Sequence, residues 1–399
     1  MAISLPLLAS LVALYWSAFN LTAAGALTIA FFGLSLIPGA LSASASAVFS
    51  AYEKMEYPAL LTSIATLLRV ALGLVALLSG FGIAGLGFIA LVVNVVIAAL
   101  FWLLLRTTFF QPRWQVDWNA ARRLAVLAFP LMINNFLSSI FFRIDVLFLK
   151  PMQGDAATGY YTTAYKFIDG LNIIPAFFTL AVFPLFSRYA VSSTESLVFA
   201  FMRSLKFLLT IALPITVLIT LVADQIILLF FGEPFAPAIG ALQILIWFLP
   251  FSYINSLTHY VLIALNRQRY LTFAFLIGVT FNILANLVVI PRFGYLGAAG
   301  VTVLSEIVLL IPFFVAVKQE LGRLPAGGLL LRPALATLLA SLPTALLHGL
   351  APWPLLVLAS GLLYLPALLL VGGIDREDMR LLHRLLRQAQ PVAAAEPAR

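Results

Sequence analysis

The sequence predicts an all-α polytopic membrane protein, a two-lobe parallel-repeat bundle of about 12 transmembrane helices. Hydrophobic residues make up 63% of the 399 residues and charged residues only 10%, whereas soluble domains carry roughly 25% charged residues. A soluble fold of this length has too little interior to bury so much apolar surface. The apolar runs are continuous, as helices of about 20 residues require, and lack the alternation of barrel strands.

Twelve apolar stretches fit this length requirement. We predict spans at 2–19, 24–51, 57–79, 83–106, 125–149, 158–187, 203–230, 237–265, 270–290, 295–317, 328–349 and 352–373. The sixth and eighth spans are long, so we expect tilts or breaks at Pro175 and Pro250.

The distribution of Lys and Arg predicts the orientation. With the N-terminus inside, eighteen of the 23 basic residues lie on inner segments, two on outer segments and three within spans. Positively charged loops stay on the cytoplasmic side, so we expect a multi-pass protein of the bacterial inner (plasma) membrane with both termini cytoplasmic. The net charge of +8 then reflects topology, and we expect no nucleic-acid partner.

An internal repeat organises the chain. Residues 81–96 align without gaps on 293–308, with Phe-Gly at the start of both segments and a further shared Gly three residues on. Both segments have the same predicted orientation, which indicates a parallel repeat. We expect its glycines (Gly85, Gly87, Gly297 and Gly300) to serve close helix packing.

The repeat predicts the domain boundaries. We expect an incomplete N-terminal lobe of four helices at 1–110, an interfacial linker with two Trp residues at 111–124, a C-terminal lobe of six helices at 125–320, two additional helices at 325–374 and a cytoplasmic tail at 375–399. The first lobe lacks counterparts of about 125–209. We interpret this as an N-terminal truncation of the product or its gene model, the alternative being a protein that works without that piece.

Several motifs in 128–190 carry a family resemblance. They are F-P-L at 129–131, F-R-I-D at 142–145, G-Y-Y at 159–161, A-Y-K at 164–166 and F-P-L-F-S-R at 183–188. They resemble the polysaccharide/O-antigen flippase-type family of the multidrug/oligosaccharidyl-lipid/polysaccharide exporter superfamily. The resemblance implies fourteen helices in two lobes that rock around a central cavity. This chain departs from it in the short first lobe.

Ionisable residues inside spans are costly and therefore candidates for function. At about 100° per residue, Arg143 shares a polar stripe with Asn135 and Ser139, while Asp145 falls on another stripe. We expect one stripe to line a cavity and the other to meet a neighbouring helix. The alternative is a structural pair of Arg143 with Asp169.

Further candidates lie in other spans. Lys166 and Asp169 are three residues apart and either neutralise each other or bind substrate phosphate and a coupling ion. Arg69 has no acidic residue near its depth, which favours a ligand-facing role. Glu306 aligns with Asn94 in the repeat and either faces the lobe interior or joins helices. We interpret His259 as a packed bundle residue.

These residues define the expected site. The substrate-binding candidates are Arg69, Arg143, Lys166, Asn135 and Ser139, and the coupling-ion or structural candidates are Asp145, Asp169 and Glu306. We expect no catalytic residue, metal or cofactor, and coupling to an H⁺ or Na⁺ gradient. Arginine suits phosphate geometry, which agrees with a lipid-linked diphosphate as substrate.

The leading hypothesis is a monomeric flippase that moves undecaprenyl-diphosphate-linked oligosaccharide from the inner to the outer leaflet by alternating access. Its partners are membrane lipid, the lipid-linked oligosaccharide and other polysaccharide-assembly membrane proteins. The alternatives are a drug/cation antiporter of the same superfamily and an inactive truncated homologue. A glycan polymerase or ligase would need a larger outer loop than this sequence offers.

Overall fold

The computed structural model describes residues 23–52, 54–110, 117–322, 324 and 329–373, and these form helices without any β-strand. The predicted span 2–19, residues 111–116 of the linker and the tail 375–399 lie outside the described residues. The chain divides into two compact units, Met1–Arg122 and Arg123–Arg399.

The first unit contains three described helices. They are α2 (Ala23–Ala51), α3 (Glu56–Leu78) and α4 (Gly82–Thr108). Helices α2 and α4 pack along each other and α3 packs on α4. Phe49, Leu61, Val93 and Phe101 form the buried core of this unit. These apolar residues face one another while leucines on the outer faces stay exposed, as a bilayer allows.

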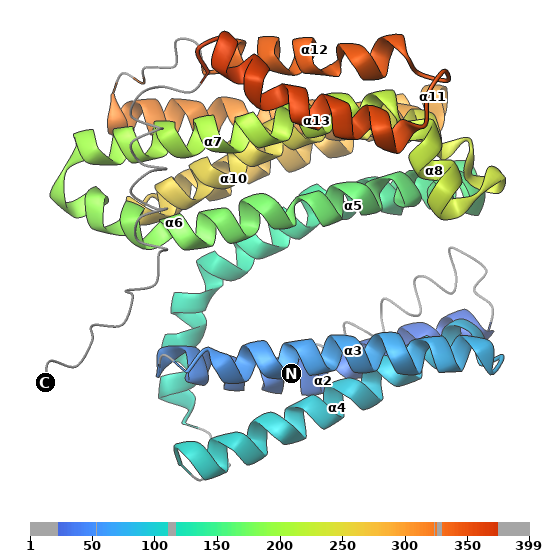
Figure 1. The fold of residues 1–399 in the computed structure, drawn as a ribbon. Helices are drawn as coiled ribbons and strands as arrows, with labels where there is room; N and C mark the ends of the chain where they lie inside the picture. Colours follow the sequence, from blue (N-terminus) through green and yellow to red (C-terminus); the bar gives the residue numbers. More distant parts are fainter. Residues whose placement is uncertain (1–22, 53, 111–116, 323, 325–328, 374–399) are drawn as a thin grey trace, which may run out of the picture. The chain divides into compact units, whose positions relative to one another are not determined.

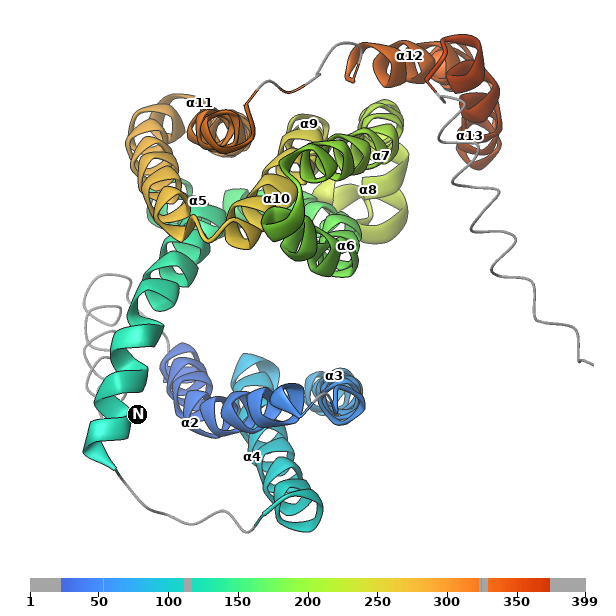
Figure 2. The same cartoon turned by 90° about the vertical axis from the view of Figure 1, so that its left-hand side faces the viewer.

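The second unit begins within a long, kinked helix. Its elements are α5 (Trp118–Leu171), α6 (Ile173–Ser192), α7 (Thr194–Leu221), α8 (Ala223–Phe231), the 3₁₀ turn η1 (Glu233–Phe235), α9 (Ala238–Leu245), α10 (Phe248–Ala264), α11 (Gln268–Leu321), α12 (Leu331–Leu346) and α13 (Trp353–Leu370). Helices α6, α7 and α10 run side by side (Figures 1 and 2). The non-helical residues Gly154 and Gly294 divide α5 and α11.

The helices are long and apolar enough for a multi-pass membrane protein. Among the described residues, seven helices meet the length and hydropathy of a span, and the pair α9 and α10, bent by 41°, makes an eighth if it is taken as one span. Two of these stretches, of 61 and 54 residues, contain the kinks at Gly154 and Gly294. Each of the two is long enough for two crossings.

The two predicted breaks occur close to the expected prolines. Helix α6 starts at Ile173, so Pro175 lies in its first turn, where a missing N–H costs nothing. Helix α9 ends at Leu245 and α10 begins at Phe248, just before Pro250. The predicted single spans 158–187 and 237–265 are therefore each divided between two helices.

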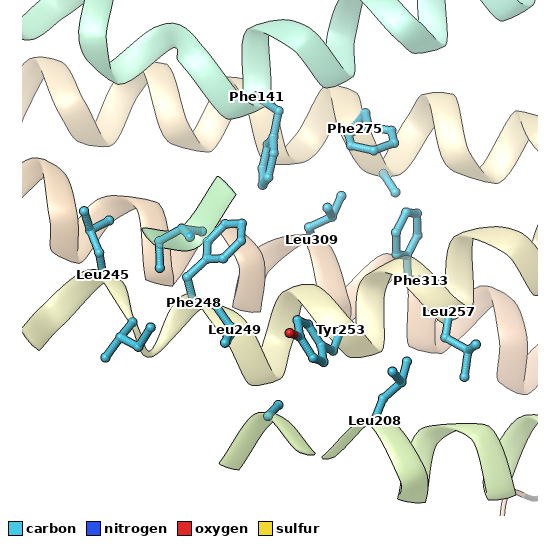
Figure 3. Close-up of a cluster of buried hydrophobic side chains, with 14 of the residues drawn as sticks. Phe141, Leu208, Leu245, Phe248, Leu249, Tyr253, Leu257, Phe275, Leu309 and Phe313 are labelled. Atoms are coloured by element: carbon cyan, nitrogen blue, oxygen red, sulfur yellow. The ribbon is translucent and has the colours of Figure 1, made fainter. Parts of the chain in front are cut away.

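Buried aromatic and aliphatic side chains fill the centre of the second unit (Figure 3). Phe141 of α5, Phe248 of α10 and Phe275 of α11 belong to this core, and each is at most 4% exposed. Leu309 and Phe313, further along α11, belong to the same cluster. The core fixes α5, α10 and α11 around the polar cavity described below.

The repeat appears in the backbone geometry. Gly82 and Gly294 both adopt positive φ, at 58° and 59°, a conformation that favours glycine. The amide of Lys54 donates to Phe49 O at 2.9 Å, and the equivalent amide of Arg267 donates to Leu262 O at 2.8 Å. Both copies thus turn at the same places.

The repeat glycines differ in how closely other atoms approach them. A Cβ on Gly87 would lie 3.1 Å from Thr28 O on α2, so this glycine does allow close helix packing. A Cβ added to Gly85 or Gly297 would instead lie too close to Phe81 or Phe293 respectively, the residue four positions earlier in the chain. Gly300 has no atom within 4 Å of an added Cβ. The packing prediction is therefore wrong for Gly300.

The last two helices form a hairpin on the second unit. Thr344 Oγ1 lies 2.8 Å from Ser360 Oγ between α12 and α13. Helix α12 also packs against α7, and Tyr364 Oη donates to Thr210 O at 2.8 Å. The hairpin is thus joined to the lobe by packing and by a hydrogen bond to the α7 backbone.

Candidate functional site

A polar cavity of about 510 Å³ lies within the second unit. Its walls come from α5, α6, α10, α11 and the junction at Asn172. The lining residues with polar side chains are Ser138, Ser139, Arg143, Tyr165, Asp169, Asn172, Ser252, Asn255, Ser256, His259, Tyr260 and Glu306. This volume falls in the range of small-molecule binding pockets.

Arg143 and Asp169 form an ion pair at the cavity wall. Arg143 Nη2 donates to both carboxylate oxygens of Asp169, at 3.2 and 3.1 Å, and both side chains are about half exposed. The guanidinium also lies over the Tyr165 ring, 5.3 Å from its centroid. The structural pairing that was an alternative for Arg143 is therefore formed, and it is formed inside the cavity.

Glu306 and Asn255 form a buried pair in the cavity lining. Asn255 Nδ2 donates to Glu306 Oε2 at 2.6 Å and to Glu306 O at 2.9 Å. The residues are 1% and 4% exposed. Glu306 Oε1 and Asn255 Oδ1 have no hydrogen-bond partner. Two buried acceptor oxygens are thus left without a donor, which is costly in an apolar surrounding.

Asp145 belongs to a separate buried cluster that does not line the cavity. Tyr161 Oη donates to Asp145 Oδ2, and Thr302 Oγ1 donates to the same oxygen at 2.9 Å. Asp145 Oδ1 has no partner. The polar stripe of Arg143 and Ser139 thus faces the cavity, while Asp145 meets Thr302 on α11.

Lys166 and Asn135 lie outside the cavity lining. Lys166 Nζ sits over the Phe231 ring of α8, 5.7 Å from its centroid. Asp169 is bound by Arg143 instead, so the mutual pairing of Lys166 and Asp169, one of the two alternatives, is not the pairing that the structure shows. The exposed Asn135 accepts a hydrogen bond from Ser139 Oγ through its backbone oxygen, at 2.7 Å.

Arg69 lies in the first unit, on α3. It donates to Asn94 Oδ1 on α4 at 2.6 Å, and Asn94 Nδ2 donates to Ser35 O on α2 at 3.2 Å. The Asn94 side chain lines a second cavity of about 480 Å³. Within the described part of the chain Arg69 has no carboxylate partner, so its positive charge is not neutralised there.

Sequence analysis missed part of the cavity wall. Asn255 and Ser252 lie within the largely apolar helix α10 and were not predicted as site residues. His259 lines the cavity as well, with its ring packed beside Phe275 and Phe313. The interpretation of His259 as a packed residue is thus incomplete. Four-residue spacing of Asn255 and His259 on one helical face was the available signal.

Comparison with known proteins identifies the family. A family model described as "Polysaccharide biosynthesis protein" matches residues 1–240. The chain belongs to the polysaccharide biosynthesis protein family. A curated relative, an uncharacterised membrane protein of Methanocaldococcus jannaschii, is 26% identical to this chain over 183 residues. That match covers 45% of this chain and 36% of the relative, so the chain spans about a third of the relative's length.

Solved structures show the fold. A structure of the lipid II flippase MurJ in an inward closed conformation is similar with a TM-score of 0.73 at 16% identity, covering 97% of this chain and 83% of that one. An inward-facing multidrug resistance transporter of the MATE family gives 0.66, also at 16% identity, covering 82% and 79%. A transporter of the MOP superfamily from Pyrococcus furiosus gives 0.59 at 17% identity, covering 82% and 75%. This polysaccharide biosynthesis protein thus has the fold of the MOP superfamily transporters.

Proposed function

We propose that this chain is a flippase for undecaprenyl-diphosphate-linked oligosaccharide, working in the bacterial inner membrane with both termini in the cytoplasm. Its family and its MurJ-like fold support this proposal. The observation that carries it is an arginine within a membrane-spanning helix, Arg69, whose only bonded partner in the described residues is the neutral Asn94. An unneutralised cation at this depth is costly unless an anion meets it.

The substrate divides into parts that need different surroundings. The diphosphate needs a fixed cation, and the planar guanidinium of Arg69 suits its oxygens. The oligosaccharide needs polar groups within a cavity. The isoprenoid tail stays in the bilayer. Alternating access then moves the polar head across without covalent chemistry by the protein.

Coupling to an H⁺ or Na⁺ gradient completes the proposal. Asp169 is neutralised by Arg143, whereas Asp145 and Glu306 each retain one buried carboxyl oxygen without a partner. A proton or a metal cation would satisfy such an oxygen. Asp145, which does not line the cavity, is therefore a better coupling candidate than Asp169.

Binding of the lipid alone tests the role of Arg69. The protein in lipid nanodiscs is titrated with undecaprenyl diphosphate while its thermal unfolding midpoint is measured. We expect the lipid to raise the midpoint, and Arg69→Ala to weaken binding at least tenfold because a charge-assisted hydrogen bond is lost.

Arg106→Ala is the matched control, since Arg106 lies in the last turn of α4, away from Asn94. It should bind the lipid as the wild type does. If Arg69→Ala binds undecaprenyl diphosphate with unchanged affinity, the proposed role of Arg69 is wrong.

One observation favours the drug/cation antiporter as a second candidate. Glu306 lines the cavity with a buried oxygen that lacks a donor, and a cationic drug would be attracted to it. Tetraphenylphosphonium transport into proteoliposomes separates the two functions. Tetraphenylphosphonium transport that is abolished by Glu306→Gln would favour the antiporter. No tetraphenylphosphonium transport by the wild-type protein would favour the flippase.

A further inference from the structure

The contents of the second-unit cavity indicate which part of the substrate this cavity takes. We propose that this cavity is a subsite for the neutral, hydroxyl-bearing sugar of the lipid-linked substrate, and that the diphosphate does not bind there. The inference rests on the proposed function and specifies which part of the substrate the cavity takes.

The unpartnered atoms of the cavity determine what kind of ligand fits. Glu306 Oε1 and Asn255 Oδ1 are buried and accept no hydrogen bond. A ligand that satisfies them must bring donors. Sugar hydroxyls and acetamido N–H groups are donors. An ionised phosphate presents only acceptor oxygens, which these two oxygens would repel.

The charge of the cavity also disfavours phosphate. Arg143 is the one Lys or Arg side chain among the described lining residues, and Asp169 holds it through both carboxylate oxygens. A diphosphate would have to displace Asp169 and leave that carboxylate without its cation. Arg69, in the first unit, has no such competitor among the described side chains.

The remaining walls suit a sugar. Tyr260 and Phe142, both partly exposed, supply aromatic faces, against which the C–H surface of a pyranose ring packs. Ser138, Ser139, Ser252 and Ser256 supply hydroxyl groups that both donate and accept. Apolar faces interrupted by a few polar groups are typical of small-molecule sites. The lining therefore matches both surfaces of a carbohydrate.

Direct binding measurements test this assignment. The full chain in nanodiscs is mixed with neutral disaccharides of glucose, galactose, mannose and N-acetylglucosamine, and saturation-transfer NMR reports binding. Inorganic pyrophosphate is titrated separately and in competition. We expect at least one disaccharide to bind and pyrophosphate not to displace it.

Variants connect the binding to the cavity. We expect Asn255→Ala and Glu306→Gln each to weaken disaccharide binding about tenfold, as the loss of a buried hydrogen bond does. Ser256→Ala, a milder change on the same wall, should weaken it several-fold. Glu195→Gln is the matched control, because Glu195 lies exposed in the first turn of α7. Arg69→Gln should weaken pyrophosphate binding and leave the disaccharide unaffected.

Three results would overturn the assignment. They are the failure of every disaccharide to bind, the displacement of a bound disaccharide by pyrophosphate, and disaccharide binding that is unchanged in Asn255→Ala, Glu306→Gln and Ser256→Ala alike. The measurement requires no transport. Sugar binding without lipid movement would therefore contradict the flippase proposal alone, and lipid movement without sugar binding would contradict this inference alone.

Discussion

Arg143 and Asp145 are two residues apart on α5, yet their side chains lie in different environments. Arg143 reaches into the cavity and pairs with Asp169, while Asp145 is buried against Tyr161 and Thr302. The helical rotation of about 200° between them separates the two charges. One helix thus supplies both a cavity wall and a buried polar joint.

The Arg143–Asp169 pair should behave as a coupled unit. Arg143→Gln leaves Asp169 without its cation, so we expect a lower unfolding midpoint. The double variant with Asp169→Asn should recover much of the loss, because no unpaired charge remains. Both side chains are about half exposed, so the coupling energy should be about 1 kcal/mol or less. A double-mutant cycle of thermal unfolding measures it. If the losses of stability in the two single variants add up in the double variant, the proposed coupling of Arg143 and Asp169 is wrong.

Residue spacing predicted part of this site. The 100° rotation per residue correctly separated Arg143 from Asp145, because both lie on one regular helix. The three-residue spacing of Lys166 and Asp169 did not predict the partner of Asp169, because Asp169 forms its ion pair with an arginine 26 residues away. A partner that is brought close only by the tertiary fold cannot be recognised from the local sequence. Asn255 was missed for a similar reason, as its partner Glu306 lies on another helix.

At the level of elements, the long helices turn at glycines. Gly294 divides α11 with a φ of 59°, and Gly82 begins α4 with a φ of 58°. The aligned Phe-Gly pairs in the sequence predicted this correspondence. The long-range packing of α5, α10 and α11 depends on side-chain shape, and periodicity could not predict it.

The glycines after the α11 kink allow a matched test. A Cβ on Gly297 would lie 2.7 Å from both Phe293 Cβ and Val289 Cγ1, so Gly297→Ala should destabilise the protein by about 1–3 kcal/mol. Gly300→Ala, three residues on, meets no atom within 4 Å and should be neutral or slightly stabilising. Thermal unfolding of both variants checks this. Equal changes in the unfolding midpoint of the two variants would contradict the close packing described around Gly297.

At the scale of the whole molecule, the apolar helices define a multi-pass protein, and the Lys and Arg bias predicts its orientation. The chain contains no cysteine, so any single Cys substitution is a unique label. Asp155 and Arg269 are both exposed and lie on predicted outer and inner loops respectively.

Labelling of intact cells tests that orientation. We expect a membrane-impermeant maleimide to label Asp155→Cys from outside, and to label Arg269→Cys only after the membrane is opened. The reason is that positively charged loops stay on the cytoplasmic side. Labelling of both from the same side would contradict the predicted topology.

The most direct test of the flippase proposal is lipid movement itself. The full chain is reconstituted in proteoliposomes with a fluorescent undecaprenyl-diphosphate-linked disaccharide, and the fraction exposed to an impermeant glycosidase is followed with time. We expect protein-dependent movement of the probe, slowed at least tenfold by Arg69→Ala and unaffected by Arg106→Ala. Movement no faster than in protein-free vesicles would contradict the flippase proposal.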